Sequence, residues 1–155
     1  MNKFLKYLFI IFFFYTLYSC GDEIPDGGGG AVNFRLELGN TGRDAVLRNI
    51  SSYKEFTTPR SANEKVGKSG LLVINIGIKD DGLFDLKAYD LCCPFENRID
   101  TKINLIGLKG VCPKCKSEFD VTGIGDRTSG PATRGLFFYR IRAEGTSGDY
   151  RVSNY

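Results

Sequence analysis

Alternating apolar and polar positions mark the start of the folded part of this chain. From Val32 to Leu38 every second residue is apolar, and the residues between are Asn, Arg and Glu. A period of two places the apolar set on one face and predicts a half-buried strand. The run at 71–76, apolar except for Asn75, predicts a fully buried strand. Asp81-Gly82 predicts a tight hairpin, with a returning strand over 83–89.

Weaker patterns predict the remaining elements. Residues 45–69 are polar with scattered apolar positions, which indicates a short irregular strand or turn followed by a loop. Further short strands are expected over 102–108, 116–121, 136–142 and 150–153. The total is about eight or nine short antiparallel strands with no convincing amphipathic helix. The sequence therefore predicts an all-β sandwich or small barrel.

The N-terminus has the pattern of an export signal. Lys3 and Lys6 precede an apolar run over 7–17, which is shorter than the roughly 20 residues of a spanning helix. Leu17-Tyr18-Ser19-Cys20 resembles the lipobox of bacterial lipoproteins, in which the cysteine becomes the lipid-bearing first residue. We expect residues 1–19 to be a lipoprotein signal peptide and Cys20 to be the lipidation site.

A flexible tether is expected over 20–30, since four consecutive glycines follow an acidic, proline-bearing stretch. The domain would then span 31–155 and be held to a membrane through its lipid anchor, outside the cytoplasm. Asp22 and Glu23 resemble acidic sorting signals of some Bacteroidetes-type lipoproteins. The expected location is the cell envelope, as an outer-membrane lipoprotein facing either the periplasm or the surface.

Composition excludes several classes of function. The chain of 155 residues contains no histidine, which removes imidazole general bases, nucleophile–histidine pairs and imidazole metal ligands. Without Lys3 and Lys6, 19 basic side chains balance 18 acidic ones, and no basic stripe for nucleic acid is visible. No enzyme signature is present, and the chain offers no sign of a particular protein partner. We expect a non-catalytic protein.

Four cysteines lie in two predicted loops. Cys92 and Cys93 are adjacent, and Cys112 and Cys115 form a C-x-x-C pair. A C-x-x-C turn allows two thiolates to converge on one metal ion, and the earlier pair strengthens that signal. Neighbouring strand residues point to opposite faces, so Cys92 and Cys93 can share one ion only where the loop leaves β geometry.

The segments around these cysteines resemble the cluster-side segments of Rieske domains. They are Ala88–Glu96 with Cys92-Cys93-Pro94-Phe95, Val111–Val121 with Cys112-Pro113-Lys114-Cys115, and Gly130-Pro131-Ala132 before the Tyr139 strand. The resemblance covers most of 31–154, and within the family it is to Rieske-like lipoproteins of the Bacteroidetes. It implies a Rieske-like β fold with the cysteine loops at its tip. Rieske domains hold a [2Fe–2S] cluster with two cysteines and two histidines.

The resemblance also shows where this chain departs from the family. Cys93 and Cys112 match the two cysteine ligands, whereas Phe95 and Cys115 stand where the two histidines belong. Phenylalanine cannot bind iron, so a Cys₂His₂ cluster with its high potential is impossible here. The loop at 130–132 matches the one that covers the cluster in the family.

Four states of the cysteines remain open. Cys92, Cys93, Cys112 and Cys115 would form a closed, structural Cys₄ site with Zn²⁺, or would ligate a low-potential [2Fe–2S] cluster for electron transfer. Disulfide bridges between the loops are equally compatible with an envelope location, and the thiols could also be free. The expected function is a membrane-anchored, degenerate Rieske-like module that binds a metal or is bridged; the alternative is an electron carrier.

Overall fold

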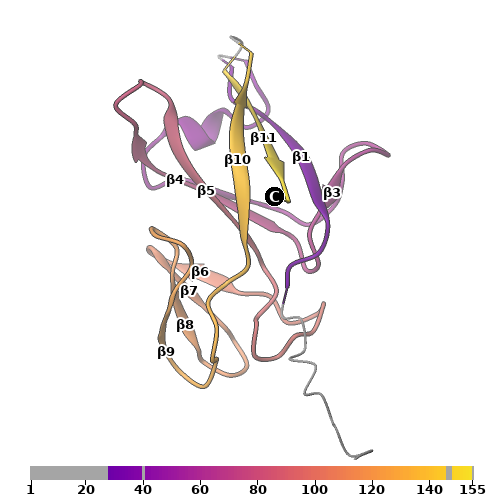
Figure 1. Cartoon of the computed structure of the whole chain (residues 1–155), viewed down its shortest axis with the longest axis vertical. Helices are drawn as coiled ribbons and strands as arrows, with labels where there is room; N and C mark the ends of the chain where they lie inside the picture. Colours follow the sequence, from indigo (N-terminus) through magenta and orange to yellow (C-terminus); the bar gives the residue numbers. More distant parts are fainter. Residues whose placement is uncertain (1–27, 40, 146–147, 155) are drawn as a thin grey trace, which may run out of the picture.

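The computed structural model describes residues 28–39, 41–145 and 148–154 (Figure 1). The predicted signal peptide, Cys20 and most of the tether lie outside these residues. The elements are β1 (Val32–Glu37), the 3₁₀ turn η1 (Ala45–Arg48), β2 (Tyr53–Phe56), β3 (Lys65–Val66), β4 (Leu71–Ile78), β5 (Phe84–Asp90), β6 (Asn104–Ile106), β7 (Lys109–Val111), β8 (Glu118–Asp120), β9 (Arg127–Ser129), β10 (Phe138–Glu144) and β11 (Asp149–Ser153).

The fold is all-β, as the sequence predicts. Seven strands form an antiparallel, nearly closed, barrel-like sheet in the order β2-β4-β5-β10-β11-β1-β3. The strictly alternating segment is β1, and its apolar side chains Val32, Phe34 and Leu36 are buried. The hairpin at Asp81-Gly82 joins β4 to β5. Gly82 has a φ of 80°, a positive value that such a turn requires and that glycine adopts without strain.

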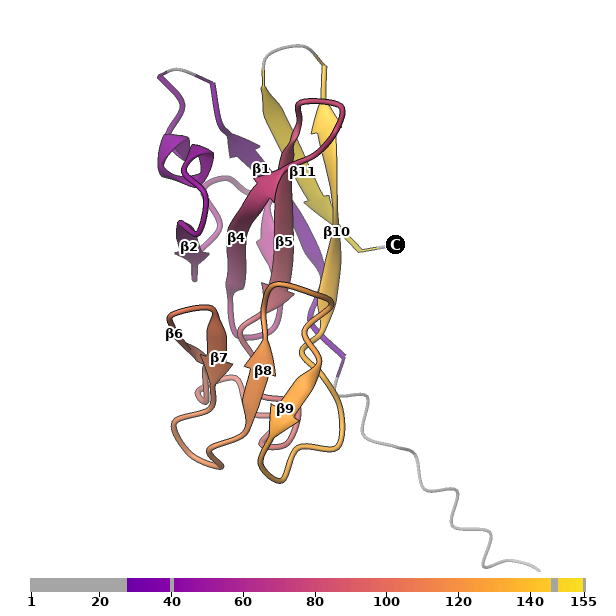
Figure 2. The same ribbon diagram turned by 90° about the vertical axis from the view of Figure 1, so that its left-hand side faces the viewer.

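A second sheet of four short strands, in the order β6-β7-β8-β9, lies below the first (Figure 2). The chain enters it after β5 and leaves it into β10, so it is an insertion between two neighbouring strands of the large sheet. Phe119 and Val121 are both fully buried there. Both cysteine loops belong to this insertion.

Strand β4 explains how the two sheets form one structure. Leu71 and Val73 pack into the core of the barrel-like sheet, whereas Leu72 and Ile74 pack into a second core with the small sheet. Both faces of this strand are therefore buried, which is why Leu71–Ile74 is a continuous apolar run rather than an alternating one.

The described part of the chain has more strands than expected. It contains eleven strands instead of eight or nine. β3 and β9 fall in segments whose sequence indicates a loop or a Gly-rich connection, and β2 lies where the sequence indicates a short irregular strand or turn. They are two to four residues long, too short to show a period. Hydrogen bonds to partner strands define them: β2 pairs with β4, β3 with β1 and β9 with β8. Within the described residues no helix has the length and apolarity of a membrane span.

Candidate metal centre

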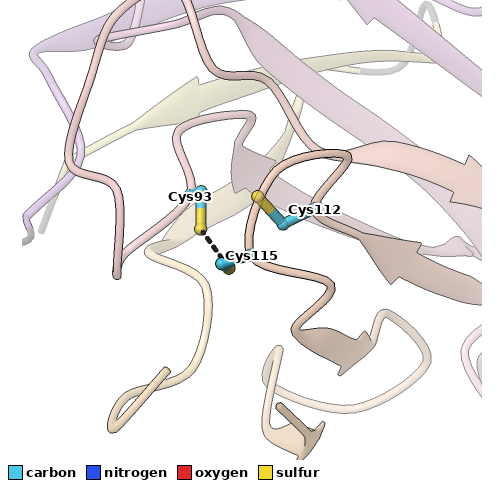
Figure 3. A group of neighbouring side chains, drawn as sticks. All are labelled: Cys93, Cys112 and Cys115. Carbon is cyan, nitrogen blue, oxygen red and sulfur yellow. Dashed lines mark hydrogen bonds between the residues drawn. The ribbon is translucent and has the colours of Figure 1, made fainter. Parts of the chain in front are cut away.

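Three of the four cysteines predicted as ligands converge at the tip of the small sheet (Figure 3). Cys93 comes from the loop after β5, and Cys112 and Cys115 come from the turn between β7 and β8. Their three Sγ atoms all lie within 4.8 Å of one another, and the Cys93 and Cys115 sulfurs are 3.6 Å apart. The four domain cysteines are free thiols in this structure. We call these three residues the thiol cluster.

The spacing of the thiol cluster fits a tetrahedral metal ion. With Zn–S bonds of about 2.3 Å, two sulfurs of a tetrahedral shell lie about 3.8 Å apart. The separation of 3.6 Å between Cys93 and Cys115 is close to this value. Thiolate sulfur is a soft donor that selects Zn²⁺, Cu⁺ or iron over Mg²⁺ and Ca²⁺. The donor set and its geometry therefore fit a thiophilic ion.

The fourth predicted ligand, Cys92, is not part of this cluster. Its Sγ faces the backbone oxygens of Arg98, at 3.6 Å, and Cys93, at 3.7 Å. Cys92 forms an isolated β-bridge with Lys102, so its backbone is extended and its side chain projects away from that of Cys93. Phe95, at the position of the first Rieske histidine, is half exposed and supplies no ligand atom.

Burial and hydrogen bonding shift the pKa values of Cys93 and Cys115 in opposite directions. Burial raises the pKa of Cys93 to about 12, since desolvation disfavours the thiolate. Burial also raises the pKa of Cys115, but hydrogen bonds from the hydroxyl and backbone of Ser117 outweigh it, and the net pKa lies below the usual value. Cys115 is therefore the thiol that ionises first of these two.

Ser117 joins the thiol cluster to the loop at 130–132. Its Oγ lies 3.2 Å from the Cys115 sulfur and accepts a hydrogen bond of 3.0 Å from the Ala132 backbone N–H. Ser117 is fully buried, and Gly130 packs directly on its backbone. The loop at 130–132, which matches the cluster-covering loop of Rieske domains, thus lies against the cysteine turn. Sequence reasoning did not single out Ser117, because a serine after a C-x-x-C motif carries no signal of its own.

Asp90 holds the base of the first cysteine loop. Its buried carboxylate accepts hydrogen bonds from the Cys92 backbone N–H at 2.8 Å, from the Tyr139 hydroxyl at 2.6 Å and from the Gly30 backbone N–H at 3.0 Å. It also accepts backbone N–H groups of the 68–69 segment. A carboxylate with this many donors is satisfied without a counter-ion. Asp90 is the last residue of β5, directly after the strand expected over 83–89, and its role depends on contacts that form only in the folded chain.

Comparison with known proteins adds no relative to these observations. No protein-family model matches the chain, and no curated protein matches it either. The fold and the site themselves define the class: an all-β protein whose three clustered cysteines could hold a metal ion.

Proposed function

We propose that this protein is a membrane-anchored, non-catalytic lipoprotein whose Rieske-like domain binds one thiophilic ion, Zn²⁺ in the first instance, through Cys93, Cys112 and Cys115. The observation that carries the proposal is the convergence of three sulfurs from two separate loops within 4.8 Å. A [2Fe–2S] cluster takes four protein ligands. Three sulfurs that all lie within 4.8 Å of one another can share one ion, which favours a single ion over a cluster whose ligands are divided between two irons.

The role of the ion would be structural. A metal bound by Cys93, Cys112 and Cys115 would join the loop after β5 to the turn between β7 and β8. Two of these thiols are fully buried, and the chain has no histidine for proton transfer. Structural zinc sites of small domains contribute on the order of 10 kcal/mol to folding. Such a site would stabilise the small sheet, whose four strands have only three residues each.

Metal analysis of the protein purified from its own envelope tests this function. We expect about one zinc per chain and a colourless solution. The C93S, C112S and C115S variants should each lose the metal, whereas C92S, which changes a buried cysteine outside the cluster, should retain it. A reddish-brown protein with two irons would instead establish the electron carrier. Metal-free protein that retains every thiol would overturn both.

A second candidate rests on the same short distance. Cys93 and Cys115, with sulfurs 3.6 Å apart, would form a disulfide if an envelope oxidant accepted two electrons and both thiol protons were released. Non-reducing peptide mapping separates this candidate from metal binding. A Cys93–Cys115 cross-link in protein from the envelope would support it, and alkylation of both thiols would exclude it.

The lipoprotein assignment is supported by the sequence at 1–20, and its test is independent of the metal. Metabolic labelling with palmitate should mark the full-length protein and not the C20S variant, which should also leave the membrane fraction. Protease treatment of intact cells then distinguishes a surface-facing protein, which is digested, from a periplasm-facing one, which survives. Equal labelling of the parent and C20S would refute the assignment.

A further inference from the structure

The two cysteine loops contain the same local structure. Each begins with Cys-Pro, at Cys93 and at Cys112, and continues for three residues. The Asn97 backbone N–H donates to the Cys93 carbonyl at 2.8 Å, and the Lys116 N–H donates to the Cys112 carbonyl at 3.1 Å. Both closing residues have positive φ, 49° for Asn97 and 61° for Lys116. The chain therefore makes the same five-residue turn twice, once in each loop.

The repeat identifies one further residue that corresponds to a ligand. In the second turn the first and fourth residues, Cys112 and Cys115, both place a sulfur in the thiol cluster. In the first turn the first residue, Cys93, does the same, and the fourth residue is Glu96. The two turns share the same closing hydrogen bond and positive φ, so their fourth residues occupy equivalent positions, although the Glu96 carboxylate lies outside the group of three sulfurs in this structure and pairs with Lys114. Glu96 is thus the counterpart of Cys115.

The surroundings of Glu96 support this correspondence independently. Its side chain is only 10% exposed, although glutamate is one of the least often buried residues. Its carboxylate reaches across to the opposite turn and pairs with the Lys114 ammonium at 2.6 Å, between the two cysteines of that turn. Its backbone N–H hydrogen-bonds the Cys93 thiol. Glu96 therefore contacts both loops that carry the thiol cluster.

We propose that Glu96 is the fourth protein ligand of the metal centre and that Lys114 holds its carboxylate while the site is empty. The inference rests on the proposed binding of a metal by the thiol cluster. Binding exchanges one cation for another: the carboxylate leaves the ammonium and coordinates the ion. Three thiolates and one carboxylate complete a tetrahedral shell for Zn²⁺, for which carboxylate oxygen is an accepted ligand. Cys92 is not needed.

Titration of the reduced, metal-free full-length protein with Co²⁺, followed by competition with Zn²⁺, tests the ligand. Tetrahedral Co²⁺ reports its ligands through visible bands and thiolate charge-transfer absorption. We expect E96A to weaken Zn²⁺ binding by at least about tenfold, the lower end of what loss of an outer-shell partner costs, and to alter the visible bands. The control is E118A, which removes a glutamate of the same small sheet that is paired with Lys109 at 3.0 Å.

The E96C variant makes the result independent of folding defects. It gives the first turn the C-x-x-C pattern of the second, and we expect tight binding with stronger charge-transfer absorption, as for a fourth thiolate. If E96A matches E118A in affinity and spectrum while both bind, the ligand assignment is wrong and the three-thiol site stands. If the parent protein binds neither Co²⁺ nor Zn²⁺, the proposed function itself fails.

Lys114 has a matched control within its own turn. K114Q releases the Glu96 carboxylate and should tighten Zn²⁺ binding severalfold. K116Q removes the same charge two residues away, from an ammonium that donates to the Pro113 carbonyl at 2.6 Å. A larger gain for K114Q than for K116Q supports the exchange of partners at Glu96. Equal gains would attribute the effect to net charge alone and overturn the role of Lys114.

Discussion

Substitution of Gly130 is the sharpest test of how the loop at 130–132 packs on the cysteine turn. Its φ is +88°, and a Cβ added there would meet the Ser117 backbone, with Ser117 Oγ at 2.8 Å and Ser117 N at 2.9 Å. Gly82 is a matched control, because its φ is +80° and a Cβ there would have nothing within 4 Å. G130A and G82A thus place a Cβ at nearly the same φ, but only the Cβ of G130A contacts Ser117.

The expected magnitudes follow from these contacts. A Cβ in the left-handed region costs about 1–2 kcal/mol, and the reduced freedom of the unfolded chain offsets about 0.4–1 kcal/mol of that. G82A should therefore destabilise the protein by about 1 kcal/mol. In G130A the clash is with buried backbone, and overpacking of this kind adds about 1–3 kcal/mol. We expect a total of about 2–4 kcal/mol for G130A.

Urea unfolding of the reduced full-length protein, purified in mild detergent without metal, measures both variants. The midpoint should fall further for G130A than for G82A, with no change in the slope of the transition. G130A should also slow alkylation of Cys115, since displacing the loop removes the Ala132 hydrogen bond that orients Ser117, whose hydrogen bonds lower the pKa of that thiol. Equal midpoints for the two variants would refute the close packing of Gly130 on Ser117.

Three further predictions follow from individual side chains. In the metal-free reduced protein, iodoacetamide should modify Cys115 at lower pH than Cys93, because the pKa of Cys115 is lowered and that of Cys93 is about 12; the reverse order, seen by peptide mapping, would contradict the hydrogen bonding at this site. Burial raises the pKa of Asp44, but hydrogen bonds from an arginine, a lysine and a backbone N–H outweigh it and lower the pKa below 3.8. The ionised carboxylate therefore stabilises the fold above the unfolded-state pKa of about 4, and this contribution is lost as the pH falls through the folded-state pKa. In urea unfolding, D44N should consequently lose less stability than the parent between pH 7 and 3. Y139F should cost about 1.5–3 kcal/mol in the same assay, since the hydroxyl donates to the buried Asp90 carboxylate, and an unchanged midpoint would show that this bond does not stabilise the protein.

The sequence predicted those parts of the fold whose pattern is local. The alternation at β1, the apolar run at β4 and the Asp-Gly hairpin each indicate one conformation, and all three are confirmed. Strands β3 and β9 could not be predicted, because two or three residues show no period; β3 is defined by hydrogen bonds to β1, far along the chain, and β9 by hydrogen bonds to β8, the strand before it. The order of strands in the large sheet is non-local in the same way.

The candidate site was predictable in its residues and less so in its geometry. Spacing and type identified Cys93, Cys112 and Cys115, since C-x-x-C directs two thiols to one point. The position of Cys92 depends on whether its backbone is extended, and the bridge to Lys102 decides this only in the folded chain. Glu96 required a comparison of two turns by their hydrogen bonds, because only their first two residues share a sequence.

The burial of β4 on both faces has a consequence for how this protein denatures. Separation of the small sheet would expose Leu72 and Ile74, and opening of the barrel-like sheet would expose Leu71 and Val73, so neither half can melt while the other keeps a complete core. Cys93 and Cys112 pack in the same core as Leu72. Heating should consequently give a single cooperative transition, and an ion seated at the cysteines would raise its midpoint for the entire domain.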